Sequence, residues 1–215
     1  MENLYAILSF FRPLFNSQNY ALFCAFIMGF ILYPGRKTVT GICQANGSKK
    51  RYWSLVKFLS RGKWDADKLV TTMLTMLQNI YKDWVYVYDE THAVKTGKSQ
   101  FGLHFFRNHK RKLQKRNRNQ SKFHWGHQFA ALGLLCLSTS QAILFPVWVK
   151  MIIPGDATLN SLAVLESIFQ YISVGLVIVD RGFNKRKVFK ALLNYGHHIL
   201  CRAKSNSVFY YLPRP

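Results

Sequence analysis

Two short stretches of the chain decide its fold, WVYVYD at residues 84–89 and GLVIVD at residues 175–180. The first is filled by aromatic and β-branched residues, which favour strands, and the second is continuously apolar, as in a strand buried on both faces. Each run closes with an aspartate, so the pattern predicts Asp89 and Asp180 at the carboxyl-terminal ends of two strands. A lone buried carboxylate is costly, so each aspartate either has a partner in the fold or caps a turn or helix just past its strand.

These two aspartates stand out because the whole chain has only nine acidic residues. If the two strands are neighbours, both carboxylates converge on one point, where a divalent ion would offset their repulsion. Hard oxygen ligands select Mg²⁺ or Mn²⁺. Two such ions about 3.5–4 Å apart stabilise the attacking and leaving oxygens of a phosphoryl transfer. We therefore expect Asp89 and Asp180 to be metal-ligating and catalytic residues.

The surrounding residues 83–215 are predicted to form one α/β (α+β) domain with a mixed sheet. Three strands come first, followed by a helix, a strand, a helix and a final strand. Strands are expected at residues 84–88, 99–106, 123–138, 174–179 and 197–202, and helices at residues 158–172 and 185–195. Gly196 is expected to end the last helix.

Residues 1–80 are predicted to form a separate helical domain, because apolar residues recur there at three- and four-residue spacings. Helices are expected at Leu4–Phe15, Tyr20–Leu32, Tyr52–Leu59 and Leu69–Ile80, with a further short helix opening at residues 36–40. The basic residues of this part are Arg36, Lys37, Lys49, Lys50, Arg51, Lys57, Arg61 and Lys63. Two interpretations stay open for them, a solvated basic face on a small bundle and a domain that binds DNA ends.

Charge is the strongest feature of the composition, since 30 Lys and Arg stand against nine Asp and Glu, a net charge of +21. Almost half of the residues are apolar, so a core is available and general disorder is excluded. A folded, basic, aromatic-rich chain favours a polyanionic partner, and nucleic acid more than an anionic membrane. The apolar run Tyr20–Tyr33 stops at Pro34, well short of the about 20 residues of a spanning helix, so we expect a buried core helix there.

The densest basic stretch, Arg107–Lys122, holds eight Lys or Arg and no acid. Such a run is often a solvated loop, but between two strands of a basic protein it is at least equally suited to contact phosphates. The DNA-contacting candidates in it are Lys110, Arg111, Lys112, Lys115 and Arg116. Four more basic residues fall near the two aspartates, where contact with the DNA backbone is the favoured interpretation: Arg181, Lys185, Arg202 and Lys204.

Cysteine and histidine give weaker signals. The four cysteines lie far apart, without zinc spacing, and read as reduced thiols of a cytosolic protein. No basic segment of a signal peptide precedes the first helix. The pairs His124/His127 and His197/His198 could hold a metal, but structural or phosphate-facing histidines are favoured. Gly182 is expected to form a tight turn after Asp180.

Several motifs in order carry a family resemblance. DETHAVKTGK at residues 89–98, followed by Phe101-Gly102, resembles the first-aspartate motif of bacterial DDE-type insertion-sequence transposases, which have an RNase H-like fold. HWGH at residues 124–127 resembles that family's third strand, and Asp180-Arg181-Gly182-Phe183 matches its second motif, Asp-x-Gly-Phe. Residues 36–40 are similar to a segment of its N-terminal region. Asp-x-Gly-Phe alone is a weak signal, whereas the ordered set is strong and spans most of the chain.

The resemblance implies a metal-dependent enzyme that cleaves DNA at transposon ends and joins the freed 3′-hydroxyl to target DNA. A metal-activated water and that hydroxyl would be successive nucleophiles, two Mg²⁺ or Mn²⁺ ions would complete the site, and a homodimer could assemble on DNA. The chain would be a cytoplasmic, nucleoid-associated bacterial protein. No membrane partner is expected.

The chain departs from the family in one respect that bears on activity. The family's third acid is a glutamate on a helix downstream of the second aspartate, and no Asp or Glu follows Asp180 here. Glu90 is expected to face the other side of its strand, and Glu166 comes too early in the order, so neither is assigned as the missing ligand. The resemblance therefore implies a partial catalytic domain, from a truncated chain or a shortened gene, which is inactive alone. The alternative is a non-catalytic DNA-binding remnant or repressor.

Overall fold

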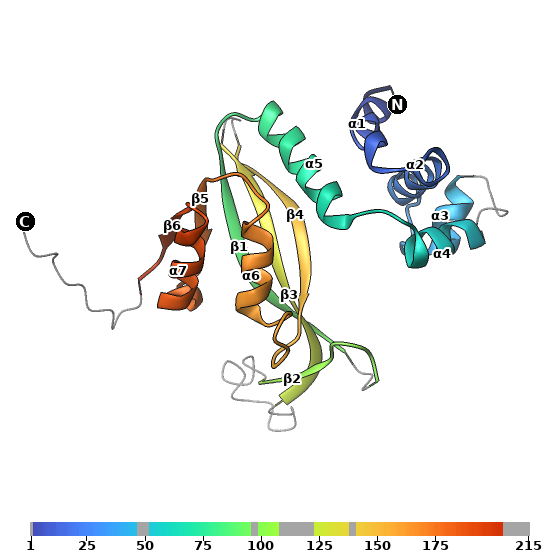
Figure 1. Cartoon of the computed structure of the whole chain (residues 1–215). Coiled ribbons are helices and arrows are strands. Elements are labelled where there is room, and N and C mark those ends of the chain that lie inside the picture. Colours follow the sequence, from blue (N-terminus) through green and yellow to red (C-terminus); the bar gives the residue numbers. More distant parts are fainter. Residues whose placement is uncertain (1, 47–51, 96–98, 108–122, 138–140, 204–215) are drawn as a thin grey trace, which may run out of the picture. The chain divides into compact units, whose positions relative to one another are not determined.

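The computed structural model describes residues 2–46, 52–95, 99–107, 123–137 and 141–203 (Figure 1). The chain divides into two compact units, Met1–Met76 and Leu77–Pro215. The first unit is helical and the second contains the sheet. The helices of the first part are α1 (Glu2–Ser9), the 3-10 helix η1 (Arg12–Leu14), α2 (Ser17–Leu32), α3 (Val39–Ala45), α4 (Tyr52–Arg61) and α5 (Ala66–Ile80), whose last turn belongs to the second unit.

Two apolar clusters hold the helical unit together. Leu8, Phe11, Phe23 and Phe58 form one cluster, and Ile42, Cys43 and Leu55 form the other. Caps define the helix starts, because the side chains of Asn16 and Thr38 accept hydrogen bonds from the first turns of α2 and α3. The helices follow the apolar spacing, with Pro13 confined to η1 between α1 and α2.

The helix expected at Tyr20–Tyr33 is present, but the expectation that it is buried was wrong. Only Phe23, Met28 and Gly29 of α2 are buried, and the last turn exposes Phe30, Ile31 and Leu32. Both clusters pack against α2, but this small unit has too little structure to surround a helix that is apolar all round. Among the described residues, no helix combines the length and the apolar character needed to cross a membrane.

The second unit is a mixed six-stranded sheet with helices, which confirms the predicted α/β class. Its elements are β1 (Trp84–Val94), β2 (His104–Arg107), β3 (Phe123–Cys136), β4 (Ile143–Ile152), α6 (Ser161–Phe169), β5 (Leu176–Val179), the 3-10 helix η4 (Arg181–Phe183), α7 (Arg186–Asn194) and β6 (His198–Cys201). The strand order is β2-β3-β1-β5-β6, with β4 also paired to β3 (Figure 1). β1, β3, β2 and β4 are joined by antiparallel ladders, whereas β5 and β6 run parallel to β1. This arrangement is consistent with a partial RNase H-like domain.

The strand β4 was missed by the sequence analysis, which left residues 143–152 unassigned. Pro146 interrupts its apolar pattern, and proline lacks the N–H that a central strand needs. The structure accommodates Pro146 because β4 pairs only with β3 there, and the register shifts between Leu132 and Gly133. An edge strand with a bulge is a position where proline is tolerated.

The two faces of the sheet differ in what covers them. On the helix-covered face, Tyr86, Tyr88, Leu132 and Leu134 are at most 1% exposed, and Phe169 of α6 packs its ring against both tyrosines. The opposite face carries Asp89, and we call it the Asp89 face. Gly196, at φ 80°, ends α7 as expected and turns the chain into β6.

Candidate functional site

Asp89 and Asp180 come from neighbouring strands at the same level of the sheet. In the parallel ladder of β1 and β5, Tyr88 pairs with Val179, so the next residue on each strand is an aspartate. Asp180 keeps an extended backbone, with φ −69° and ψ 159°. Tyr88 and Val179 are buried on the helix-covered face, so alternation directs both aspartates toward the Asp89 face, where both are exposed. The sequence pattern therefore identified two carboxylates that the fold brings together.

Asp89 does not lie at the end of its strand, which corrects one expectation. β1 continues to Val94, because it stays paired with β3 beyond the point where the short strand β5 stops at Val179. Asp89 is thus the first residue of β1 beyond the ladder with β5, and it is still paired with β3 on its other side. The sheet opens at this level, and the two carboxylates stand at the opening.

The Asp180 carboxylate is not used as a helix cap. Asp180 occupies the position before η4, but its side chain accepts no capping hydrogen bond. Its main-chain oxygen accepts instead from the Phe183 N–H at 2.9 Å and from Cys201 Sγ at 3.5 Å. The turn is therefore held by the backbone, which leaves the carboxylate available for another role. Gly182 lies in this turn without the left-handed conformation that would require glycine.

Glu90 points to the opposite side of β1 from Asp89, as expected. Its carboxylate accepts hydrogen bonds from Gln128 Nε2 at 2.7 Å, from Ser161 Oγ and from the Tyr88 hydroxyl at 3.4 Å. Burial raises the pKa of Tyr88, and the charge of Glu90, this hydrogen bond and the charge of Asp89 raise it further. Glu90 thus ties β1 to β3 and α6 beneath the sheet and does not join the aspartate pair.

The two carboxylates have the donor chemistry that a hard divalent ion requires. Asp89 and Asp180 offer hard carboxylate oxygens, although Asp89 Oδ1 also accepts from the Glu90 N–H at 2.8 Å. Within the part of the chain that the structure describes, no three His, Cys, Asp or Glu side chains group as metal ligands. Glu166 lies within α6, on the other side of the sheet. Of the three acidic ligands expected for a two-ion site, the described residues bring only the Asp89 and Asp180 carboxylates to this opening of the sheet.

The histidines belong mainly to the scaffold. His197 is buried, its Nδ1 accepts from the Gly175 N–H at 3.3 Å and its Nε2 lies 3.3 Å from the Phe169 oxygen. His127 Nε2 lies 2.9 Å from the Phe101 oxygen. His124 is three residues before His127 on β3, so the two side chains point to opposite faces and cannot share a metal.

The basic residues near the aspartates are exposed. In the parallel ladder of β5 and β6, Val179 pairs with Cys201, which puts Arg202 at the level of Asp180. Arg181 lies in η4 and Lys185 precedes α7. Lys185 and Lys187 line a cavity of about 470 Å³ that also includes Gln128 and Ser161, both partners of Glu90. Sequence reasoning missed this cavity, since only the fold brings β3, α6 and α7 together.

A second basic hollow lies in the helical unit. It has a volume of about 460 Å³, and Lys57, Arg61 and Lys63 line it together with polar side chains such as Asn16 and Gln18. All three basic residues belong to the set that the sequence singled out. Other candidates, Lys49, Lys50, Arg51, Lys110, Arg111, Lys112, Lys115, Arg116 and Lys204, lie outside the described residues.

A mixed sheet with two aspartates at the opening between parallel strands is consistent with a partial RNase H-like domain. Comparison with family models agrees: the model of the DDE superfamily endonucleases matches residues 9–215, so the chain belongs to that family. DNA is the substrate that this family implies, and its members generally use divalent metal ions. No curated protein matches the chain.

Proposed function

We propose that this chain is the DNA-binding and partial catalytic portion of an insertion-sequence transposase. Asp89 and Asp180 are its metal-ligating pair, and the transposase cleaves DNA at element ends and joins them to target DNA. The observation that carries the proposal is the parallel ladder that ends with Tyr88 and Val179 and is followed on both strands by aspartate. Membership of the DDE endonucleases supports the class of chemistry.

Each group of charged residues near the opening of the sheet and in the helical unit has its own role in this proposal. Asp89 and Asp180 hold Mg²⁺ or Mn²⁺ at the opening of the sheet. When bound, the ions neutralise charge on the phosphodiester and lower the barrier to in-line attack. Arg202 and Arg181 contact phosphates beside the carboxylates, and Lys185 and Lys187 contact the backbone further along. Lys57, Arg61 and Lys63 contact the DNA end from the helical unit.

By itself the chain is inactive in this proposal. Two divalent ions carry four positive charges and need oxygen ligands on both sides of the scissile phosphate. Two aspartates hold one ion, but they leave the second without a fixed position, and loss of positioned electrostatic stabilisation costs orders of magnitude in rate. A second candidate function, a DNA-binding repressor derived from a transposase, is favoured by the same lack of a third acidic ligand in the described part of the chain.

The test is an assay of the purified chain with labelled DNA ends and Mn²⁺, beside an Asp180→Ala variant. Both proteins are expected to bind DNA, with an affinity that falls as salt rises, and neither is expected to nick or join it. Failure of the chain to bind DNA would contradict the proposal. Cleavage that depends on Asp180 would contradict the inactivity and would show that a third ligand comes from elsewhere, such as a second subunit.

A further inference from the structure

Three aromatic side chains gather where β2 pairs with the first residues of β3. Phe105 is the ladder partner of Trp125, and the ring centroids of these two residues lie 5.0 Å apart. Phe105 and Phe123 stack with centroids 5.1 Å apart and an angle of 17° between the rings. We call these three residues the hairpin aromatic cluster. Figure 1 shows β2 and this end of β3 extending beyond α6 and α7.

The cluster remains accessible despite its apolar character. Phe105 is 48% exposed and Phe123 is 43% exposed, and the nearby Phe101 is 78% exposed. Grouped exposed aromatic rings usually mark a contact surface. Arg107, the ladder partner of Phe123, is exposed as well, and the sequence from Arg107 to Lys122 has eight basic residues and no acid. A fitting partner is therefore polyanionic and presents flat apolar surfaces, which describes a nucleic acid with accessible bases.

The cluster lies on the Asp89 face. Asp89 pairs with Ala131, and Phe123 and Trp125 are an even number of residues from Ala131 on the same strand, so all these side chains point to one side. The eight residue steps from Phe123 to Ala131 span at most about 27 Å along a strand. That length corresponds to roughly eight nucleotides at the spacing of phosphates in one DNA strand.

We propose that the hairpin aromatic cluster stacks on unpaired bases of the DNA whose phosphodiester lies at Asp89 and Asp180, an inference that rests on the proposed function. The rings of Phe105 and Phe123 provide the stacking surface, and Arg107 contacts a phosphate beside it. Paired bases inside a duplex have no free faces, so the cluster selects DNA that is frayed, mismatched or single-stranded. The unpaired bases lie within roughly eight nucleotides of the scissile phosphate.

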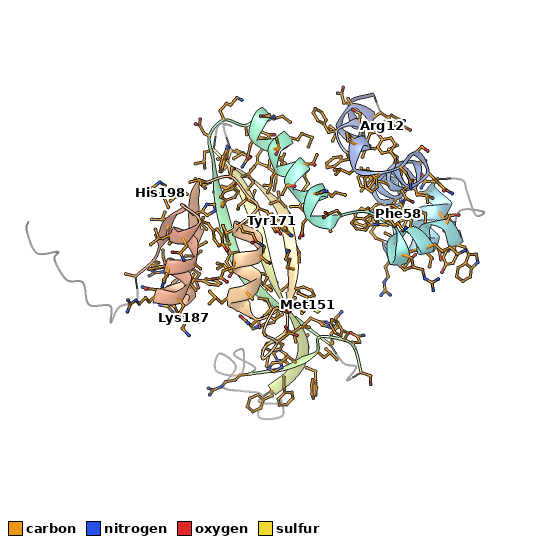
Figure 2. All side chains as sticks on the ribbon, viewed as in Figure 1. Arg12, Phe58, Met151, Tyr171, Lys187 and His198 are labelled. Atoms are coloured by element: carbon orange, nitrogen blue, oxygen red, sulfur yellow. The ribbon has the colours of Figure 1, made fainter. Side chains whose placement is uncertain are left out.

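The experiment measures the affinity of the full chain by fluorescence anisotropy for three DNAs of related sequence. These are a full duplex, the same duplex with mismatches near one end, and the single strand. The wild type is expected to bind the mismatched and single-stranded DNAs more tightly than the duplex. In the variant Phe105→Ala/Phe123→Ala this preference falls by roughly tenfold for each stacked base, while duplex affinity is unchanged. Tyr171→Ala removes an aromatic side chain that is 58% exposed elsewhere in the same unit and should change nothing (Figure 2).

A second variant separates stacking from simple apolar contact. Phe105→Leu/Phe123→Leu keeps apolar volume but has no planar rings. It should therefore lose the preference for mismatched and single-stranded DNA, as the alanine variant does. It also replaces the alanine variant in the test if that variant does not fold. Retention of the preference in either variant, with duplex binding intact, overturns the stacking proposal and leaves the proposed function standing. Absence of all DNA binding by the wild type overturns both. Self-association without DNA that either variant abolishes would assign the cluster to a protein interface and overturn the stacking proposal.

Discussion

Tyr88 of β1 and Val179 of β5 are partners in a parallel ladder, and both side chains are buried, with Phe169 of α6 packed against Tyr88. The residue after each of them is an aspartate on the opposite, accessible face. The buried pair thus fixes the height and direction of Asp89 and Asp180 without a contact between the carboxylates themselves. A scaffold of this kind can hold two like charges close together, because each carboxylate remains exposed to solvent or a bound ion.

Glu90 should behave as a structural residue and not as a metal ligand. Glu90→Ala leaves Gln128 and Ser161 without their acceptor, so the free energy of unfolding should fall by about 1–3 kcal/mol. Urea unfolding followed by circular dichroism measures this change. Glu90→Gln, which keeps one acceptor oxygen, should lose less. A variant with unchanged stability but no Mn²⁺ binding would reverse the assignment.

Alkaline pH should destabilise the sheet unit through its two buried tyrosines. Burial raises the pKa of both Tyr86 and Tyr88 in the folded chain. A tyrosine whose pKa is higher in the folded than in the unfolded chain contributes its full stabilisation of the fold below the unfolded-state pKa of about 10. This contribution is lost as the pH rises from that value toward the folded-state pKa. The free energy of unfolding should therefore decrease as the pH rises through this range, and the decrease should be smaller in the variant Tyr88→Phe. Equal pH dependence in the wild type and Tyr88→Phe would contradict the role of Tyr88.

The basic stretch between β2 and β3 should supply sequence-independent affinity. Replacement of Lys110, Arg111, Lys112, Lys115 and Arg116 by alanine should weaken binding to all DNA sequences alike. If all five contact phosphates, the slope of log affinity against log salt should flatten by roughly 4 to 5. Anisotropy titrations at several salt concentrations give that slope. An unchanged slope would show that this stretch is only solvated.

The basic hollow of the helical unit predicts a second, smaller effect. Lys57→Ala, Arg61→Ala and Lys63→Ala combined should flatten the same slope by roughly 3. Lys82→Ala, which removes one exposed charge outside this hollow, is the control and should leave the slope as it is. A flattening of the slope by Lys82→Ala that is about one third of the effect of the triple variant would mean that only the net charge of the chain matters.

The sequence predicted strand positions for the two aspartates because each follows directly on a run of aromatic, β-branched or other apolar residues. It could not predict β4, since Pro146 hides the strand pattern and only pairing with β3 reveals it. It also wrongly placed Asp89 at the end of its strand. The strand continues to Val94 because it stays paired with β3, a partner distant in sequence. The hairpin aromatic cluster was equally hidden, since Phe105 and Phe123 meet only through the register of β2 and β3. Long-range pairing decides each of these features, and local patterns do not contain it.

The central claim is that Asp89 and Asp180 together hold a divalent ion. Mn²⁺ binding to the purified chain, measured by electron paramagnetic resonance, tests it most directly, with the variants Asp89→Asn and Asp180→Asn. Asp83→Asn, at the other end of β1, is the control because it changes the same charge at an exposed position. One weak Mn²⁺ site in the wild type and in Asp83→Asn, lost in each of the other two variants, is the predicted result. Equal Mn²⁺ binding in all four proteins, or a site that depends on only one of Asp89 and Asp180, would contradict the account.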